Sequence, residues 1–238
     1  MMQPTNGDLS HDELERLRQF DTCTLSNAIE RLHVRPRNEG FISGAVTCRF
    51  PRFEPVIGYA VTARMRSSVT PVNGRYYYAH PEFWNYLAGF SGPRILVILD
   101  GDEEPGLGAL LGEAYARISG AFGCVACVTN GSMRDAPGIE ALGYQVFSGS
   151  VAVSHAYAHV VDFGDTVEIG GLSISNGDLL HGDLHGVHMI PRGGVKDLAP
   201  LAEQVLREDR ELFALTERKD FSAAMLSDKV AEAMKRHL

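Results

Sequence analysis

Apolar residues recur along this chain in patterns that separate helices from strands. Asp12–Phe20 carries leucines on one helical face, and Ser26–Leu32 is typical of a second short helix. Thr24 or Ser26 is the expected cap of that second helix. In the middle of the chain the apolar residues form continuous runs, which indicate buried strands of a parallel sheet. These runs predict strands over Ile95–Asp100 and Cys124–Thr129, and alternation with β-branched residues predicts a further strand over Val56–Met65.

The segments between and after these strands predict a mixed α/β fold. We expect helices from Pro81 onward, over Ala109–Ser119 with Gly120 or Gly123 as the stop, and over Pro137–Leu142. Turn residues separate short strands after that, and the C-terminus is helical from Lys196 to about Leu215 and again from Ser222. The later strands are expected at Gln145–Ser148, around Val151, around Val160, at Thr166–Ile169 and at Leu172–Ile174. This order favours one α/β domain over residues 1–238.

Composition narrows the class of protein. Hydrophobic residues make up 45% of the 238 positions, which is enough for a sizeable core. The formal net charge of -8 disfavours a general nucleic-acid binder, because such a protein needs a basic patch. The start of the chain lacks the pattern of a signal peptide, and no apolar run is long enough to span a bilayer. We therefore expect a cytoplasmic protein that contacts neither nucleic acid nor membrane, with its four cysteines reduced.

Arg134 and Asp135 are the first candidates for chemistry. They follow the predicted strand Cys124–Thr129 and what the sequence predicts to be a tight turn, Asn130–Gly131. An arginine there can clamp a carboxylate through two hydrogen bonds, and an adjacent aspartate can hold a divalent cation through oxygen. The same spacing also suits a purely structural Arg–Asp pair that fixes the loop, and spacing alone leaves both interpretations open.

A second candidate feature is the Gly-rich loop that opens the helix before that strand, with Gly112 and Glu113 at its centre. A helix start offers free backbone N–H groups and the positive end of the helix dipole to an anion. The loop contains neither GxxxxGK[ST] nor a GxGxxG motif after a strand, so a nucleotide site is not indicated.

These features come together in a family resemblance. The stretch 110–139, LLGEAYARISGAFGCVACVTNGSMRDAPGI, resembles the family of 4-hydroxy-4-methyl-2-oxoglutarate/4-carboxy-4-hydroxy-2-oxoadipate (HMG/CHA) aldolases and the regulator of ribonuclease E activity A. FDTCTLSNAIERL at 20–32 is similar to the opening of that family. GGLSISNGDLLHGDLHGVHMIP at 170–191 holds its later pattern through Gly171, Gly177, Asp178, Asp183, Gly186, Val187 and Pro191. The resemblance runs from about residue 20 to 212.

The resemblance implies a compact β/β/α, swivelling-domain-like sandwich with C-terminal helices that assembles as a homotrimer or hexamer. It also implies a metal-dependent lyase that releases pyruvate. Asp135 would hold Mg²⁺ or Mn²⁺, and Arg134 would bind the carboxylate or carbonyl of pyruvate. The backbone N–H groups of Gly112, Glu113, Ala114 and Tyr115 would cradle the carboxylate. The site would lie between subunits, with Glu208 or Glu211 of the neighbour as the candidate for a further acidic group.

The sequence departs from the family pattern at several positions. Asn130 stands where an aspartate is usual, Tyr115 is bulky, and Leu184 and His185 replace part of an acidic run. The aromatic segment RYYYAHPEFWNY, residues 75–86, is unlike the short aldolases. These changes keep the metal and carboxylate site and indicate a differently shaped pocket, so they bear on the identity of the substrate.

Two further motifs suggest metal or redox chemistry. Cys124 and Cys127 form CxxC inside an apolar run without a second such pair, which favours core packing over zinc or redox chemistry. His181, His185 and His188, and separately His155 and His159, have helical zinc-ligand spacing. Gly182 and Gly186 interrupt the first cluster, so a turn and a strand are favoured there.

Two functions follow as hypotheses. The first is a divalent-metal-dependent class II lyase acting on a small 2-oxo acid. It would cleave a 4-hydroxy-2-oxo acid by retro-aldol chemistry, decarboxylate oxaloacetate, or do both. The alternative is a non-catalytic, ring-shaped regulator that binds a ribonuclease or another protein partner.

Overall fold

The centre of the molecule is a mixed β-sheet. The computed structural model describes residues 9–74 and 76–236 of the chain. Four neighbouring strands are parallel, and the strands at either side of them run antiparallel to their neighbours. The order across the sheet is β1 (Thr47–Cys48), β5 (Gln145–Val151), β4 (Cys124–Met133), β3 (Arg94–Asp100), β2 (Val56–Arg66), β9 (Leu179–Asp183) and β10 (Gly186–Ile190). β6 (His159–Phe163) pairs with the last part of β2.

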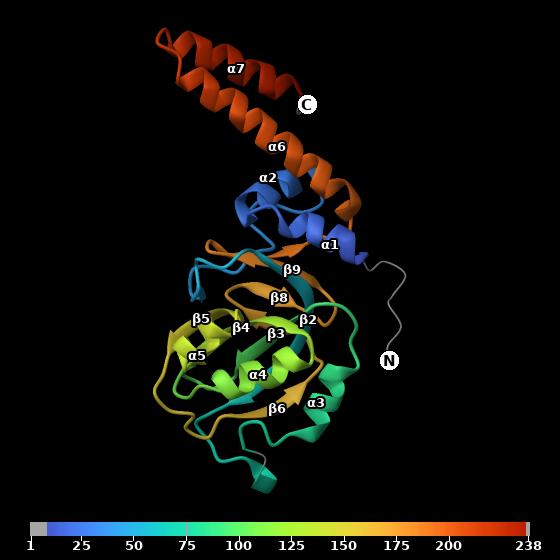
Figure 1. Cartoon of the computed structure of the whole chain (residues 1–238), viewed down its shortest axis with the longest axis vertical. Coiled ribbons are helices and arrows are strands. Elements are labelled where there is room, and N and C mark those ends of the chain that lie inside the picture. The colour runs from blue at the N-terminus through green and yellow to red at the C-terminus, as the bar shows by residue number, and fades with distance from the viewer. Residues whose placement is uncertain (1–8, 75, 237–238) are drawn as a thin grey trace.

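The parallel strands are apolar on both faces because both faces are covered. In β3, Leu96 and Ile98 pack with the helical layer, whereas Ile95 and Val97 belong to the core cluster on the opposite face. The helical layer comprises α3 (Pro81–Ala88), α4 (Glu113–Ala121) and α5 (Ala136–Ala141) (Figure 1). The hairpin of β7 (Val167–Ile169) and β8 (Leu172–Ile174) closes the other face. This two-sided burial explains why the strands appear in the sequence as continuous runs.

A second helical group packs beside the sheet. α1 (His11–Arg18) and α2 (Thr22–Leu32) enclose an apolar cluster with the first half of α6 (Val195–Thr216). Figure 1 shows α6 and α7 (Ala223–Arg236) extending away from the sheet as a helical pair. The remaining short element is a 3-10 turn, η1 (Val72–Gly74). Within the described residues, no helix is both long and apolar enough to cross a membrane.

The expected α/β fold class with C-terminal helices is confirmed, and several boundaries differ. α2 begins at Thr22, because the side chain of Asp21 accepts a 2.6 Å hydrogen bond from the N–H of Thr24. The expected caps Thr24 and Ser26 therefore lie inside the helix. The expected single domain over 1–238 stays a prediction.

Two corrections concern the candidate site. The expected helix start at Ala109 is wrong, because Leu111 is extended and forms a β-bridge with Met133, so α4 begins only at Glu113. The expected tight turn at Asn130–Gly131 is also wrong, because β4 continues to Met133. Its pairing with β5 resumes at Ser132 after a register shift. Arg134 and Asp135 therefore follow a longer strand than the sequence predicts.

Candidate functional site

The loop that leads to α4 is tied down at the carboxyl ends of β2 and β3. Asp102 accepts hydrogen bonds from the backbone N–H and hydroxyl of Ser67, at 2.6 and 2.9 Å. It accepts two more from the N–H and hydroxyl of Ser68, at 2.9 and 2.6 Å. Burial acts to raise the pKa of Asp102, but these four hydrogen bonds outweigh it and hold that pKa below its usual range. The carboxylate is thus a fixed anchor for the loop.

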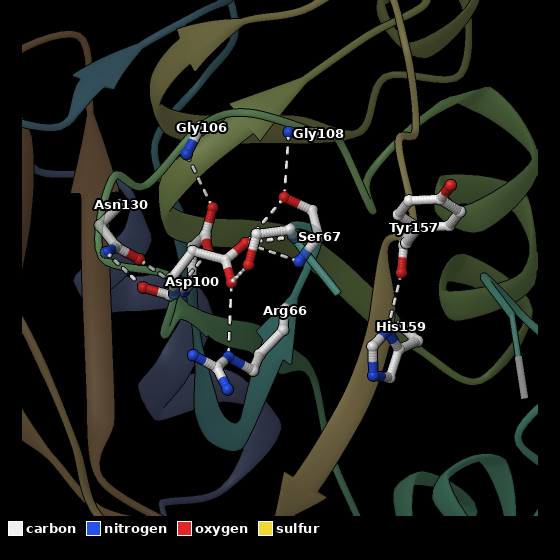
Figure 2. A network of polar contacts seen from close by, with 10 residues as sticks. Arg66, Ser67, Asp100, Gly106, Gly108, Asn130, Tyr157 and His159 are labelled. Atoms are coloured by element: carbon white, nitrogen blue, oxygen red, sulfur yellow. Dashed lines mark hydrogen bonds and ion pairs between the residues drawn. The ribbon is translucent and has the colours of Figure 1, made fainter. Parts of the chain in front are cut away.

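Asp100 and Asn130 complete this polar network (Figure 2). Asp100 accepts from the N–H of Gly106 at 2.7 Å, and burial raises the pKa of its carboxyl. The side chain of Asn130 accepts from the N–H of Asp100 at 2.7 Å and donates to its carbonyl at 3.0 Å. An ionised aspartate at position 130 could not donate the second of these bonds. The asparagine therefore joins the end of β3 to β4.

The first turn of α4 is open toward Asp135. Gly112 is the N-cap with φ of -130° and no side chain to accept from the helix. The N–H of Glu113 instead donates to Oδ2 of Asp135 at 3.3 Å. Arg134 donates its backbone N–H to the carbonyl of Leu111 at 2.9 Å, which holds the end of β4 beside the helix start. The positive end of α4 therefore faces the Asp135 carboxylate.

Arg134 and Asp135 form one polar group with His155. Nε of Arg134 lies 3.2 Å from Oδ1 of Asp135, and its Nη1 lies 3.0 Å from Nδ1 of His155. Burial and the charge of Arg134 lower the pKa of His155, so the imidazole is neutral and accepts from the guanidinium. Asp135 has a left-handed backbone with φ of 56°, which turns its side chain back toward α4. The side chains of Arg134 and Asp135 remain 27% and 38% exposed, so solvent reaches both.

Three side chains pack closely over Gly112. A Cβ built on this glycine would stand 2.7 Å from Oδ2 of Asp135, 3.1 Å from the hydroxyl of Tyr77 and 3.2 Å from Cγ of Arg134. Three functional side chains thus converge on one point beside the helix start. The arrangement can bind a small anion, with the cationic Arg134 and the N–H groups of α4 as partners.

Tyr77 is a site residue that pattern analysis does not single out. Its N–H donates to the carbonyl of Ala158 at 2.9 Å, and its ring contacts His155 edge-on at 4.2 Å between centroids. Burial and the charge of Asp135 raise the pKa of its phenol, while Arg134 and the backbone of Tyr115 act in the other direction. The only available signal is the aromatic segment itself, which predicts a pocket wall without indicating which ring reaches the site. His155 gave no better signal, because its HxxxH spacing pointed to a helix.

The structure brings four of the proposed site residues together and separates others. Gly112, Glu113, Arg134 and Asp135 meet, although the side chain of Glu113 turns to Arg117 at 2.7 Å. Ala114 and Tyr115 follow in the first turn of α4, and the Tyr115 ring is fully buried in the core. Glu208 pairs with Arg31 and Glu211 with Lys229 in the same chain. A role for either glutamate in a neighbouring site stays a prediction.

The cysteine and histidine motifs lie elsewhere. Cys124 and Cys127 are buried in β4, and burial raises the pKa of the Cys124 thiol to about 12. His181 and His188 face each other across the β9–β10 hairpin, with ring centroids 5.3 Å apart. In the part of the chain that the structure describes, no three His, Cys, Asp or Glu side chains gather as a metal site. The spacing of His181 and His188 is thus that of two facing positions in a strand hairpin.

Comparisons with known proteins agree with this fold. A solved chain named "Crystal structure of novel cellulases from microbes associated with the gut ecosystem" has a TM-score of 0.72 at 17% identity, covering 88% of this chain and 90% of that one. RraAS2 of Streptomyces coelicolor, described as an unusual member of the RNase ES inhibitor RraA protein family, has a TM-score of 0.66 at 20% identity. That match covers 88% of this chain and 98% of the other. At these identities the likeness establishes the fold.

Sequence comparison gives the family. A protein of Halalkalibacterium halodurans named "Putative 4-hydroxy-4-methyl-2-oxoglutarate aldolase" is 26% identical over 102 residues. The match spans 42% of this chain and about half, 49%, of that relative. Residues 22–189 match the family described as RraA-like, Aldolase/RraA, and this range contains β2 to β5 and the Gly112–Asp135 site. The chain therefore belongs to the RraA-like family.

Proposed function

We propose that this protein is a divalent-metal-dependent lyase acting on small 2-oxo acids. It would cleave a 4-hydroxy-2-oxo acid to release pyruvate, decarboxylate oxaloacetate, or do both. The observation that carries this proposal is the meeting of Arg134 and Asp135 with the start of α4 at Gly112. The name of the Halalkalibacterium relative supports the same chemistry.

The charges around Gly112 suit an acid substrate. Arg134 is a permanent cation, and the positive end of α4 points to the same place. The guanidinium and the N–H groups of the first turn would bind the substrate carboxylate. His155 would keep the guanidinium in position, because it accepts from Nη1 at 3.0 Å without adding a competing charge. The contact between Arg134 and Asp135 would hold the two side chains in register.

Both reactions pass through the same enolate. In retro-aldol cleavage the 4-hydroxyl loses its proton, C4 becomes a carbonyl carbon, and the electron pair of the C3–C4 bond moves onto the pyruvate fragment. In oxaloacetate decarboxylation the C3–C4 bond breaks with loss of CO₂ and leaves the same fragment. Protonation of the enolate at C3 by solvent then gives pyruvate in either case. The site must therefore stabilise negative charge on the 2-oxo oxygen.

Asp135 fits a water-rich Mg²⁺ or Mn²⁺ site. Among the described residues, its two oxygens make long hydrogen bonds of 3.2 and 3.3 Å, and the side chain is 38% exposed. Mg²⁺ keeps several waters and commonly takes one or two protein carboxylates together with substrate oxygens. One exposed carboxylate beside a bound 2-oxo acid matches that donor set, whereas a closed three-ligand zinc site is absent from the described residues. When bound, the metal would supply Lewis-acid stabilisation of the enolate.

Pyruvate release, coupled to lactate dehydrogenase, tests the proposal. Purified protein should turn over 4-hydroxy-4-methyl-2-oxoglutarate or oxaloacetate with Mg²⁺ or Mn²⁺, and EDTA should abolish the reaction. The Asp135→Asn variant should lose at least about 100-fold in kcat/KM. Asp165→Asn is the matched control, because Asp165 is a surface aspartate, 79% exposed, paired with Arg64. Loss of activity in the control, or activity that persists in EDTA, would contradict the proposal.

The competing function is a ring-shaped regulator without turnover. The Streptomyces protein, whose description names an RNase ES inhibitor family, favours it. This alternative predicts that the protein is inactive on both substrates and captures a purified ribonuclease E-type enzyme. It also predicts that Asp135→Asn leaves that capture unchanged, because a partner surface does not need the Asp135 carboxylate beside Gly112.

A further inference from the structure

The aromatic segment that departs from the family brings one phenol to the site. Its rings pack in a chain in which Trp84 lies 4.9 Å and Tyr77 lies 5.8 Å from Tyr115, measured between centroids. Tyr115 is fully buried and belongs to α4. The segment is therefore fixed against α4, the helix whose first turn follows Gly112.

The backbone of Tyr77 is held in place as firmly as its ring. Its N–H donates to the carbonyl of Ala158 at 2.9 Å, and its φ of 54° is one that a bulky residue rarely adopts. A backbone of this kind persists where the surrounding structure determines it, and functional sites are where such residues gather. The position of the ring follows from these restraints, so the phenol is held beside Asp135 and Arg134 before any ligand arrives.

The phenol is the one uncharged donor among the three side chains nearest to Gly112. A Cβ on Gly112 would lie 3.1 Å from the Tyr77 hydroxyl, and the other two nearest atoms belong to Asp135 and Arg134. With an ordinary pKa near 10, a phenol keeps its proton at neutral pH and donates it in a hydrogen bond. Arg134 suits the carboxylate, which is charged throughout the reaction. A neutral donor suits the oxygen on which charge develops only as the bond breaks.

We propose that Tyr77 is a catalytic residue whose hydroxyl donates a hydrogen bond to the 2-oxo oxygen of the substrate as it becomes the enolate oxygen. This inference rests on the proposed lyase function and adds a group that the strand and helix motifs do not contain. No proton is transferred in this step. The O–H of Tyr77 stays intact, and the enolate takes its proton at C3 from solvent.

The test compares Tyr77→Phe with Tyr78→Phe. Both changes remove only a hydroxyl, but Tyr78 is 51% exposed and its carbonyl accepts from Trp84. Two assays are used with Mg²⁺: pyruvate release from the two substrates, and exchange of the methyl protons of pyruvate for deuterium, followed by ¹H NMR. The exchange assay reports enolate formation without any C–C cleavage. Inhibition by oxalate, which resembles the enolate, is measured for each variant.

Tyr77→Phe should lower kcat and the exchange rate by about 100-fold, with KM changed by less than about threefold. The inhibition constant of oxalate should rise, and Tyr78→Phe should match the wild type in all three measurements. A Tyr77→Phe variant with wild-type kcat and oxalate inhibition would overturn the role of Tyr77 and leave the lyase proposal standing. A wild-type protein without turnover or exchange would overturn the lyase proposal, and the role of Tyr77 with it.

Discussion

A Cβ atom on Gly112 would stand 2.7 Å from Oδ2 of Asp135, which is closer than two such atoms approach in proteins. The missing side chain at the start of α4 is therefore what lets the carboxylate approach the helix start, where it accepts from the N–H of Glu113. Gly112 has φ of -130°, a value open to any residue, so backbone freedom does not explain the glycine. The close packing of Asp135 against the helix start does.

Gly112→Ala should remove activity while leaving the fold intact. The new methyl group would push Asp135, Tyr77 and Arg134 away from the helix start, so we expect substrate turnover and oxalate binding to fall by at least about tenfold. The melting temperature should stay within a few degrees of the wild type, because alanine is tolerated at this φ and the three atoms that must shift belong to side chains. Kinetics and differential scanning fluorimetry measure the two effects.

Gly120→Ala is the matched control in the same helix. A Cβ at Gly120 would meet nothing closer than Cδ2 of Tyr144 at 3.9 Å, which is ordinary van der Waals contact. This change should leave activity unaltered and stabilise the protein by up to about 1 kcal/mol, because alanine favours a helix more than glycine does. Equal turnover in the Gly112→Ala variant and the wild type would refute the assignment of the substrate site to Arg134, Asp135 and the start of α4.

Asp135→Asn tests the metal more directly than an alanine variant. Asp135 adopts a left-handed backbone with φ of 56°, which asparagine tolerates and alanine does not. The substitution therefore removes the charge with little strain. Mn²⁺ affinity, followed by isothermal titration calorimetry with pyruvate present, should drop at least tenfold, with urea unfolding nearly unchanged. Unaltered Mn²⁺ affinity would place the cation elsewhere.

Much of the fold could be predicted from the sequence because both faces of the parallel strands are covered. The continuous runs in β3 and β4 report burial directly, and Arg134 and Asp135 follow the second of them. The end of β4 could not be predicted, because Asn130 and Gly131 are typical turn residues. Here the Asn130 side chain bonds to the backbone of Asp100, 30 positions away, and the strand continues. Local pattern does not contain such a tertiary contact.

The missing half of the candidate site is likewise tertiary. Tyr77 and His155 come from loops whose sequences have no periodicity, and they reach the site through Ala158 and Arg134. The same reason explains why α4 begins at Glu113 and not at the predicted Ala109. The bridge between Leu111 and Met133 competes with helix formation. Residues adjacent to regular elements could be predicted, whereas residues placed by long-range loop contacts could not.

The two thiols of the CxxC pair should be unreactive in the native protein. Cys124 and Cys127 are buried in β4, and burial raises the pKa of both thiols, that of Cys124 to about 12. Since the thiolate is the reactive form, N-ethylmaleimide should label neither residue without denaturant, whereas exposed Cys23 should be modified. Peptide mass spectrometry after timed labelling gives the rates. Rapid native labelling of Cys124 or Cys127 would revive a redox or metal role.

Because His181 and His188 are buried, we predict that acid destabilises the fold. Burial lowers the pKa of His181 from 6.5 to about 4, although a hydrogen bond with the backbone of Phe20 acts in the other direction. Burial, with His181 and Arg35 nearby, also holds the pKa of His188 well below its usual range. Asp183 and Asp21 act in the opposite direction on His181 without restoring its usual pKa.

The sign follows from the lowered pKa values. Between pH 6.5 and about 4 the unfolded chain binds a proton at position 181 that the folded chain does not bind. The free energy of unfolding therefore falls with decreasing pH, by about 1.4 kcal/mol per pH unit for each such histidine. The contribution is fully present above pH 6.5. Urea unfolding at half-unit steps from pH 7.0 to 4.5 measures this slope.

His181→Phe should flatten the slope by about 1.4 kcal/mol per pH unit, because the imidazole at position 181 no longer titrates. Phenylalanine keeps a flat ring in the space beside His188, so the variant should still fold at pH 7. The exposed His11 supplies the control, since its ring contacts solvent and His11→Gln should keep the wild-type slope. Parallel pH profiles for wild type and His181→Phe would show that His181 is not what makes the fold acid-sensitive.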